Sequence, residues 1–104
     1  MHFDLKSMYI FGKIKIEQFV SKHTVTKNAV ENWINIVESS EWKNHAELKQ
    51  TFPSADYVGN AKYVFNIKGN RYRIVAVVMF FEGTFVIRFI GTHEEYSKID
   101  CKTI

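Results

Sequence analysis

The chain has 104 residues, a formal net charge of +3, 46% apolar and 15% aromatic residues, and one cysteine, Cys101. This composition predicts one domain, 1–104, with a real hydrophobic core and a mild preference for anionic partners, and it excludes an intramolecular disulfide. Its apolar runs are too short for a transmembrane helix or a signal-peptide core, so we expect a cytoplasmic protein. Residues 1–7 would be an N-terminal extension of the domain.

The first half of the chain predicts a short strand and two helices. Residues 8–11 read as the strand. A helix is expected over 14–22, where apolar side chains recur every three to four residues. The next helix has the clearest apolar stripe in the chain. It should begin after a cap at Thr24 or Thr26 and end near Ser39.

Local signals then predict a third helix and a brief strand. Asn44 stands three residues before Glu47, a capping-box spacing that predicts a short helix to about Gln50. Pro53 would end that helix. Residues 56–58 read as a brief strand before the chain turns.

Three further strands are predicted over 62–67, 71–81 and 84–90, because these stretches are rich in Val, Ile, Phe and Tyr. Turn-forming residues at 68–70 and 82–83 separate them. The chain order is therefore a strand, then helices, then a meander. This order predicts an α+β fold in which N-terminal helices pack on one face of an antiparallel β-meander sheet.

Alternation along these strands predicts that cationic and polar side chains share one face of the sheet. With two-residue hairpin loops, even positions of one strand face odd positions of the next, so Thr92 should lie opposite Arg73 and Arg88 opposite Val77. The other face is apolar and would receive the helices. Cations on a strand can simply discourage edge pairing, but their apolar neighbours here favour a bound polyanion. The expected cationic face holds Lys62, Asn66, Arg71, Arg73, Arg88 and Thr92.

His93 follows the last strand, where Thr92 should cap a final helical turn. Histidine transfers protons near neutral pH, and arginine binds phosphate and stabilises developing negative charge. RNA supplies its own nucleophile, the 2′-OH, so cleavage by this route needs no metal and no cofactor. The histidines have no partners at metal-ligand spacing, and there is no glycine-rich phosphate loop. We expect His93, Arg73 and Arg88 to be catalytic, although a histidine after a strand is often purely structural.

Three motifs extend this pattern: F-P-S-A-D-Y-V-G-N at 52–60, V-F-N-I-x-G-N-x-Y-R-I-V at 64–75 and V-I-R-F-I-G-T-H-E-E-Y at 86–96. With these motifs the chain, over roughly 8–104, resembles the HigB branch of the RelE-like toxins. The resemblance implies a RelE-like fold and a ribosome-dependent mRNA endonuclease, the toxin of a type II toxin–antitoxin pair. It also implies a HigA-like helix-turn-helix antitoxin and a hetero-oligomer of the two proteins.

The resemblance also assigns residue roles. Arg73 matches the strand arginine that the superfamily places on the scissile phosphate, and His93 matches the histidine of this branch. Ser97 stands where many relatives have Asp, so any role of that Asp is absent here. Asn66, Asn70, Arg88 and Tyr96 match residues typical of the branch. The RNA contacts expected beside the catalytic residues are Lys62, Asn66, Lys68, Asn70, Arg71 and Tyr96.

Two other interpretations stay open on the sequence. The same basic sheet suits a non-catalytic RNA- or protein-binding module, and a toxin locus can decay to an inactive remnant. A neighbouring reading frame for a helix-turn-helix protein would favour the toxin.

Overall fold

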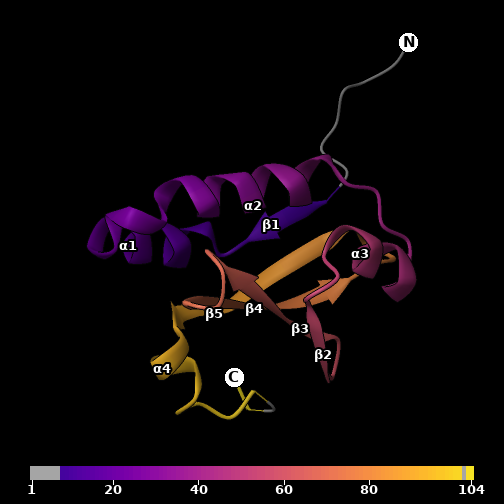
Figure 1. Ribbon diagram of the computed structural model, residues 1–104. Helices are drawn as coiled ribbons and strands as arrows, with labels where there is room; N and C mark the ends of the chain where they lie inside the picture. The colour runs from indigo at the N-terminus through magenta and orange to yellow at the C-terminus, as the bar shows by residue number, and fades with distance from the viewer. Residues whose placement is uncertain (1–7, 102) are drawn as a thin grey trace.

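The structure is a computed structural model that describes residues 8–101 and 103–104, so the expected N-terminal extension, 1–7, lies outside the described residues. Helices and strands alternate irregularly along the chain (Figure 1). In order they are β1 (Tyr9–Phe11), α1 (Lys13–Lys22), the 3₁₀ helix η1 (Thr24–Thr26), α2 (Lys27–Ser39), α3 (His45–Thr51), β2 (Asp56–Gly59), β3 (Lys62–Ile67), β4 (Tyr72–Met79), β5 (Thr84–Thr92) and α4 (His93–Tyr96).

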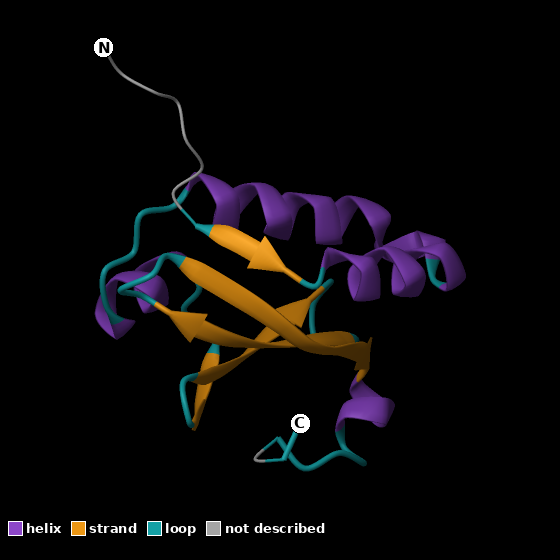
Figure 2. Ribbon diagram, turned by 180° about the vertical axis from the view of Figure 1, so that it is seen from behind, coloured by secondary structure: helices purple, strands orange, loops and turns teal. Residues whose placement is uncertain are grey.

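The strands form one sheet in the order β1-β5-β4-β3-β2 (Figure 2). Neighbours among β2 to β5 are antiparallel, but β1 is parallel to β5. The fold is therefore α+β with a mixed sheet, and the prediction of an antiparallel sheet was wrong for its first strand. A parallel pair needs a long crossover connection, and here every element between β1 and β5 supplies it.

The hairpin of β3 and β4 places Asn66 opposite Arg73, so the two residues share one face of the sheet, as alternation predicted. Its loop is longer than expected, because it takes four residues, 68–71, rather than two. Gly69 within it has a φ of 69°, a left-handed conformation that glycine adopts without strain. Arg71 therefore belongs to the turn and not to the strand.

The hairpin of β4 and β5 contains a β-bulge that the sequence pattern did not predict. Ile87 lies opposite Ala76, whereas Phe89 lies opposite Val75. Arg88 is therefore an extra residue on β5, and two residues of this strand oppose one residue of β4.

The bulge changes which face each later residue of β5 occupies. Gly91, and not Thr92, lies opposite Arg73. The β4–β5 loop also takes four residues, 80–83, so the expected pairing of Arg88 with Val77 is wrong as well. Arg88 instead lies only two to three residues along the strands from Arg73, about 7–10 Å.

Helix α2 packs across the sheet through its apolar stripe. Val30, Trp33 and Val37 recur at helical spacing and are buried. The Trp33 ring centroid lies 5.3 Å from that of Phe65 and 5.9 Å from that of Phe85. Figure 1 shows α2 on one side of the sheet and α4 with the C-terminus on the other.

Two helix starts have side-chain caps at the positions that the sequence indicated. The Asn44 side chain accepts a hydrogen bond from the Glu47 N–H at the start of α3. Thr92 and Glu95 form a complete capping box at α4. Across the described part of the chain, every helix is too short or too polar to cross a membrane.

We call the face of the sheet turned away from α2 the distal face. The C-terminal part of the chain covers much of it. Tyr96 lies over Arg73 at one end, and at the other end the Lys62 ammonium donates a hydrogen bond of 2.9 Å to the Cys101 carbonyl oxygen. Between these ends, Val64 and Val75 are 3% and 0% exposed. Lys62 is 7% exposed. Strand register assigns to this face Lys62, Val64, Asn66, Arg73, Val75, Val77 and Val86.

Burial in the aromatic core predicts that two phenylalanines contribute very differently to the free energy of unfolding. Phe85 is 0% exposed and packs against three other aromatic rings, whereas Phe81 is 101% exposed. Phe85→Ala should lower the free energy of unfolding by about 3–5 kcal/mol. Phe81→Ala should change it by less than about 0.5 kcal/mol. Urea denaturation of both variants measures this, and equal losses would contradict the packing described.

Candidate functional site

Arg73 is at the centre of the candidate site. Its Nη1 donates hydrogen bonds to the carbonyl oxygens of Asn70, at 2.8 Å, and Tyr72, at 3.3 Å. Its Cζ lies 5.8 Å from the ring centroid of Tyr96, within cation–π range. Among the residues that the structure describes, these partners fix the guanidinium without pairing it to a carboxylate. Its positive charge therefore stays available to an anion.

His93 is held beside Arg73 by its backbone. The His93 N–H donates a hydrogen bond of 2.8 Å to the carbonyl oxygen of Arg71, in the turn that precedes β4. The capping box of Thr92 and Glu95 then starts α4 at His93. The imidazole is exposed, and within 8–101 and 103–104 it has no hydrogen-bond partner. The ring is thus at the surface with both nitrogens open to a ligand.

Gly91 permits this close packing. It is buried and lies opposite Arg73. A Cβ atom at this position would lie 2.5 Å from Cζ of Phe89 and 2.7 Å from Oε1 of Glu95. Any other residue would have to displace the Phe89 ring or break the capping box. Nothing in the sequence around Gly91 predicts this requirement, because it comes from tertiary contacts and not from a turn.

Tyr96 links α4 to the C-terminal segment. Its ring lies against that of Phe89, with centroids 6.4 Å apart, and its hydroxyl accepts a hydrogen bond of 3.4 Å from the Cys101 thiol. Burial, with the Cys101 contact adding to it, raises the pKa of Tyr96 to about 12. The phenol is therefore protonated at neutral pH. It can support Arg73 or donate a hydrogen bond, but it does not act as a base.

The other predicted site residues divide into two groups. Asn66 lies opposite Arg73, and Lys68, Asn70 and Arg71 form the adjoining turn. Asn66 and Lys68 also line a cavity with residues of α2, on the other side of the sheet. Lys62 lies four residues along β3 from Asn66, about 13 Å away, and is covered by the C-terminal segment. The turn therefore lies at the same end of the sheet as Arg73 and His93, whereas Lys62 lies apart.

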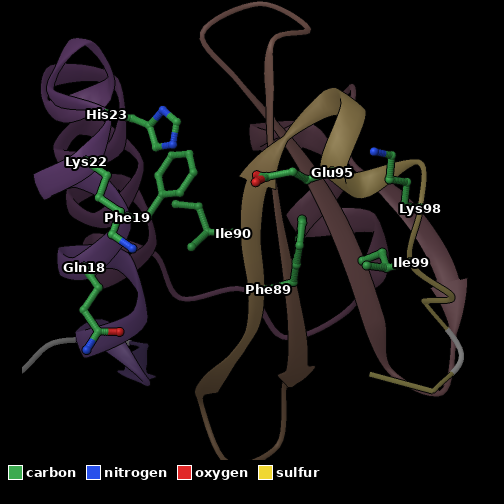
Figure 3. Close-up of a pocket in the computed structure, with 9 residues that line it drawn as sticks. All are labelled: Gln18, Phe19, Lys22, His23, Phe89, Ile90, Glu95, Lys98 and Ile99. Carbon is green, nitrogen blue, oxygen red and sulfur yellow. The ribbon is translucent and has the colours of Figure 1, made fainter.

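A cleft of about 420 Å³ opens beside this cluster, between α1 and α4 (Figure 3). Phe19 and His23 line it from the α1 side, with their rings stacked at 4.2 Å. Figure 3 shows Ile90 directed toward α1 and Phe89 directed away from it, as the bulge requires. Its lining includes Phe89 and Ile90 of β5 and Glu95 of α4, so the cleft lies next to the last residues of β5.

No group of three or more His, Cys, Asp or Glu side chains within the described ranges is arranged to hold a metal ion. An arginine without a carboxylate partner can bind an anion, and an exposed imidazole is a group that can transfer a proton.

The chain is similar to known proteins over most of its length. The family HigB_toxin, described as a RelE-like toxic component of a toxin-antitoxin system, matches residues 26–99. The mRNA interferase HigB of Escherichia coli O6:H1 is 26% identical over 94 residues, which cover 88% of this chain and 91% of that protein. The mRNA interferase toxin HigB of Escherichia coli K-12 is 32% identical over 92 residues, which cover 86% and 88%. The mRNA interferase HigB of Shigella flexneri has the same identity and coverage.

The raised pKa of Tyr96 predicts a pH dependence at alkaline pH. A phenol with a pKa near 12 in the folded protein and near 10.0 when unfolded stabilises the fold below pH 10. This contribution is lost as the pH rises through 12. In an absorbance titration, Tyr96→Phe should remove the highest tyrosine transition, and Cys101→Ala should shift it down. A Tyr96 transition close to pH 10 would contradict the described contacts.

Proposed function

The chain belongs to the HigB family of RelE-like toxins, the toxic components of toxin–antitoxin systems, and we propose that it is an mRNA interferase, an endoribonuclease that inhibits translation by cutting mRNA. The observation that carries the proposal is the environment of Arg73. Its guanidinium is held by backbone carbonyl groups and the Tyr96 ring, with no carboxylate partner among the described residues. Such a fixed, uncompensated cation suits a phosphate of RNA.

The proposed reaction uses the nucleophile that RNA carries. The 2′-oxygen attacks the adjacent phosphorus while a base removes its proton, and the bond from phosphorus to the 5′-oxygen breaks. The 5′-oxygen takes up a proton, and the products are a 2′,3′-cyclic phosphate and a 5′-hydroxyl. Arg73 would neutralise the charge that builds up on the phosphoryl oxygens. The route needs proton transfer and charge neutralisation from the protein, and no metal.

His93 is the residue proposed to transfer a proton, because an imidazole can act as acid or base near neutral pH. Its exposed ring and its backbone bond to Arg71 support this role. Tyr96, with its raised pKa, would hold Arg73 in place and not accept the proton. Arg88, about 7–10 Å along the strands from Arg73, would contact a neighbouring phosphate.

Membership of this family implies an antitoxin partner. We propose that the partner is a HigA-like helix-turn-helix protein that forms a hetero-oligomer with the toxin. We further propose that cleavage occurs on mRNA held by the ribosome, in the cytoplasm, because translation presents the mRNA there as an ordered single strand.

Arg73→Ala should abolish toxicity while the fold survives. The side chain lies on the distal face and outside the buried core, so its loss removes phosphate contact without leaving a core cavity. Loss of one preorganised charge-stabilising donor lowers the rate by about a hundredfold to a thousandfold. Lys15→Ala is the matched control, since it removes an exposed cation from α1. Growth arrest without antitoxin, mRNA cleavage during translation and melting temperature are measured together. Wild-type cleavage by a folded Arg73→Ala protein would refute the assignment.

His93→Gln separates a catalytic role from a structural one. A catalytic His93 predicts a rate loss of about a hundredfold or more, with little change in melting temperature. Any cleavage that the parent enzyme shows without ribosomes should persist in EDTA. Glu94→Gln, on the next exposed residue of α4, should leave the rate unchanged. A less stable His93→Gln protein with near-normal turnover would show that the histidine is structural.

A further inference from the structure

Two exposed aromatic side chains lie on the edge strand β1. Along the strand direction they are at the opposite end of the sheet from Arg73. Tyr9 is 54% exposed and Phe11 is 51% exposed, whereas Ile10 between them is 3% exposed and belongs to the core. The two rings are in edge-to-face contact, with centroids 4.6 Å apart and planes at 67°. Alternation along a strand therefore turns both rings away from the core.

Strand register places these rings on the distal face. Tyr9 pairs with Thr84 and Phe11 with Val86. Val86 in turn lies opposite Val77, two residue pairs along β4 from Val75 and four from Arg73. Tyr9, Phe11 and Arg73 therefore lie on the same face of the sheet.

The surface around the aromatic pair is apolar but has a cation at its inner end. Met79 is 40% exposed, and Val77 and Val86 are partly exposed. Arg88 follows the core residue Ile87 and is exposed, with no hydrogen bond or ion pair to any described residue. Phe11 lies one strand and two residues from Arg88, about 8 Å. An unpaired arginine beside exposed rings is an arrangement that binds nucleic acid.

Arg73, Arg88 and the two rings lie in this order along β5 and its neighbouring strands. On β5, Gly91 lies opposite Arg73 and Val86 lies opposite Phe11. These two β5 residues are five positions apart, a distance of about 16 Å along the strand. Arg88 lies between them. A single strand of RNA with one phosphate at Arg73 would pass Arg88 and reach the two rings within a few nucleotides.

We propose that Tyr9 and Phe11 form a stacking platform for bases of single-stranded RNA that flank the cleaved phosphate, with Arg88 binding a phosphate between the platform and Arg73. This inference rests on the proposed endoribonuclease function. Stacking on aromatic rings accepts any base, so the platform contributes affinity and alignment and leaves sequence choice to other contacts. Arg88 favours RNA over a protein partner, because a purely apolar docking surface would not need a cation at its inner end.

The test compares two double variants. Tyr9→Ser with Phe11→Ser removes the platform, and Ile14→Ser with Val25→Ser removes two equally exposed apolar side chains, 60% and 59%, outside the strands. Each variant should keep the parental melting temperature, because the side chains are exposed. In mRNA cleavage on ribosomes, the platform variant should need an about five- to hundredfold higher concentration of the ribosome–mRNA complex for half-maximal rate. Its maximal rate should be nearly unchanged, and the control variant should match the parent.

A second measurement does not depend on cleavage. Binding of a mixed-sequence single-stranded 2′-O-methyl RNA oligonucleotide should weaken by a similar factor in the platform variant. Tyr9→Trp with Phe11→Trp should restore it, because tryptophan also stacks. A parent protein that binds this RNA but never cleaves mRNA would refute the proposed function and leave the platform supported.

Two results would overturn the platform. One is equal RNA binding and equal mRNA dependence in the Ser variant and the parent. The other is a Ser variant that cleaves normally but is no longer neutralised by its antitoxin, which would identify the aromatic pair as a protein-docking surface.

Discussion

The β-bulge at Arg88 determines how the two ends of β5 relate to each other. Before it, Phe85 and Ile87 point into the core, and after it Ile90 packs against the same core. Two core residues three positions apart cannot both face inward on a regular strand. The extra residue solves this conflict and turns Phe89 to the distal face. The position of Gly91, and through it of α4, follows from that single insertion.

The candidate site is held by backbone contacts and close packing. Gly91 leaves room for the Phe89 ring, the capping box starts α4, and the His93 N–H bonds to the turn before β4. Arg73 is fixed by carbonyl groups and by the ring of Tyr96. None of these contacts neutralises the positive charge of Arg73 or forms a hydrogen bond with the ring nitrogens of His93. A site built in this way is ordered before its substrate arrives and still attracts an anion, which is what electrostatic stabilisation of a transition state requires.

Sequence signals predicted the local features well. The bounds of β3 agree with the structure, and Asn66 and Arg73 share one face as predicted. The caps at Asn44 and Thr92 also agree, because turn and cap residues act within a few positions. Features set by distant contacts were missed. Alternation predicts that Phe89 faces the core and Ile90 lies with the cations, and the bulge reverses both assignments. The parallel pairing of β1 and the cover over Lys62 depend on segments far apart in the chain.

The central claim is that RNA is bound and cleaved on the distal face, at Arg73 and His93. The most direct measurement is a structure of the protein on a ribosome with an mRNA that carries a 2′-O-methyl group at the cleavage position, which blocks the nucleophile. We expect the adjacent phosphate to contact the Arg73 guanidinium, with the His93 ring within hydrogen-bond distance of the 2′-oxygen or the 5′-oxygen. An mRNA bound across α2, or at the distal face with its blocked phosphate away from Arg73, would contradict it.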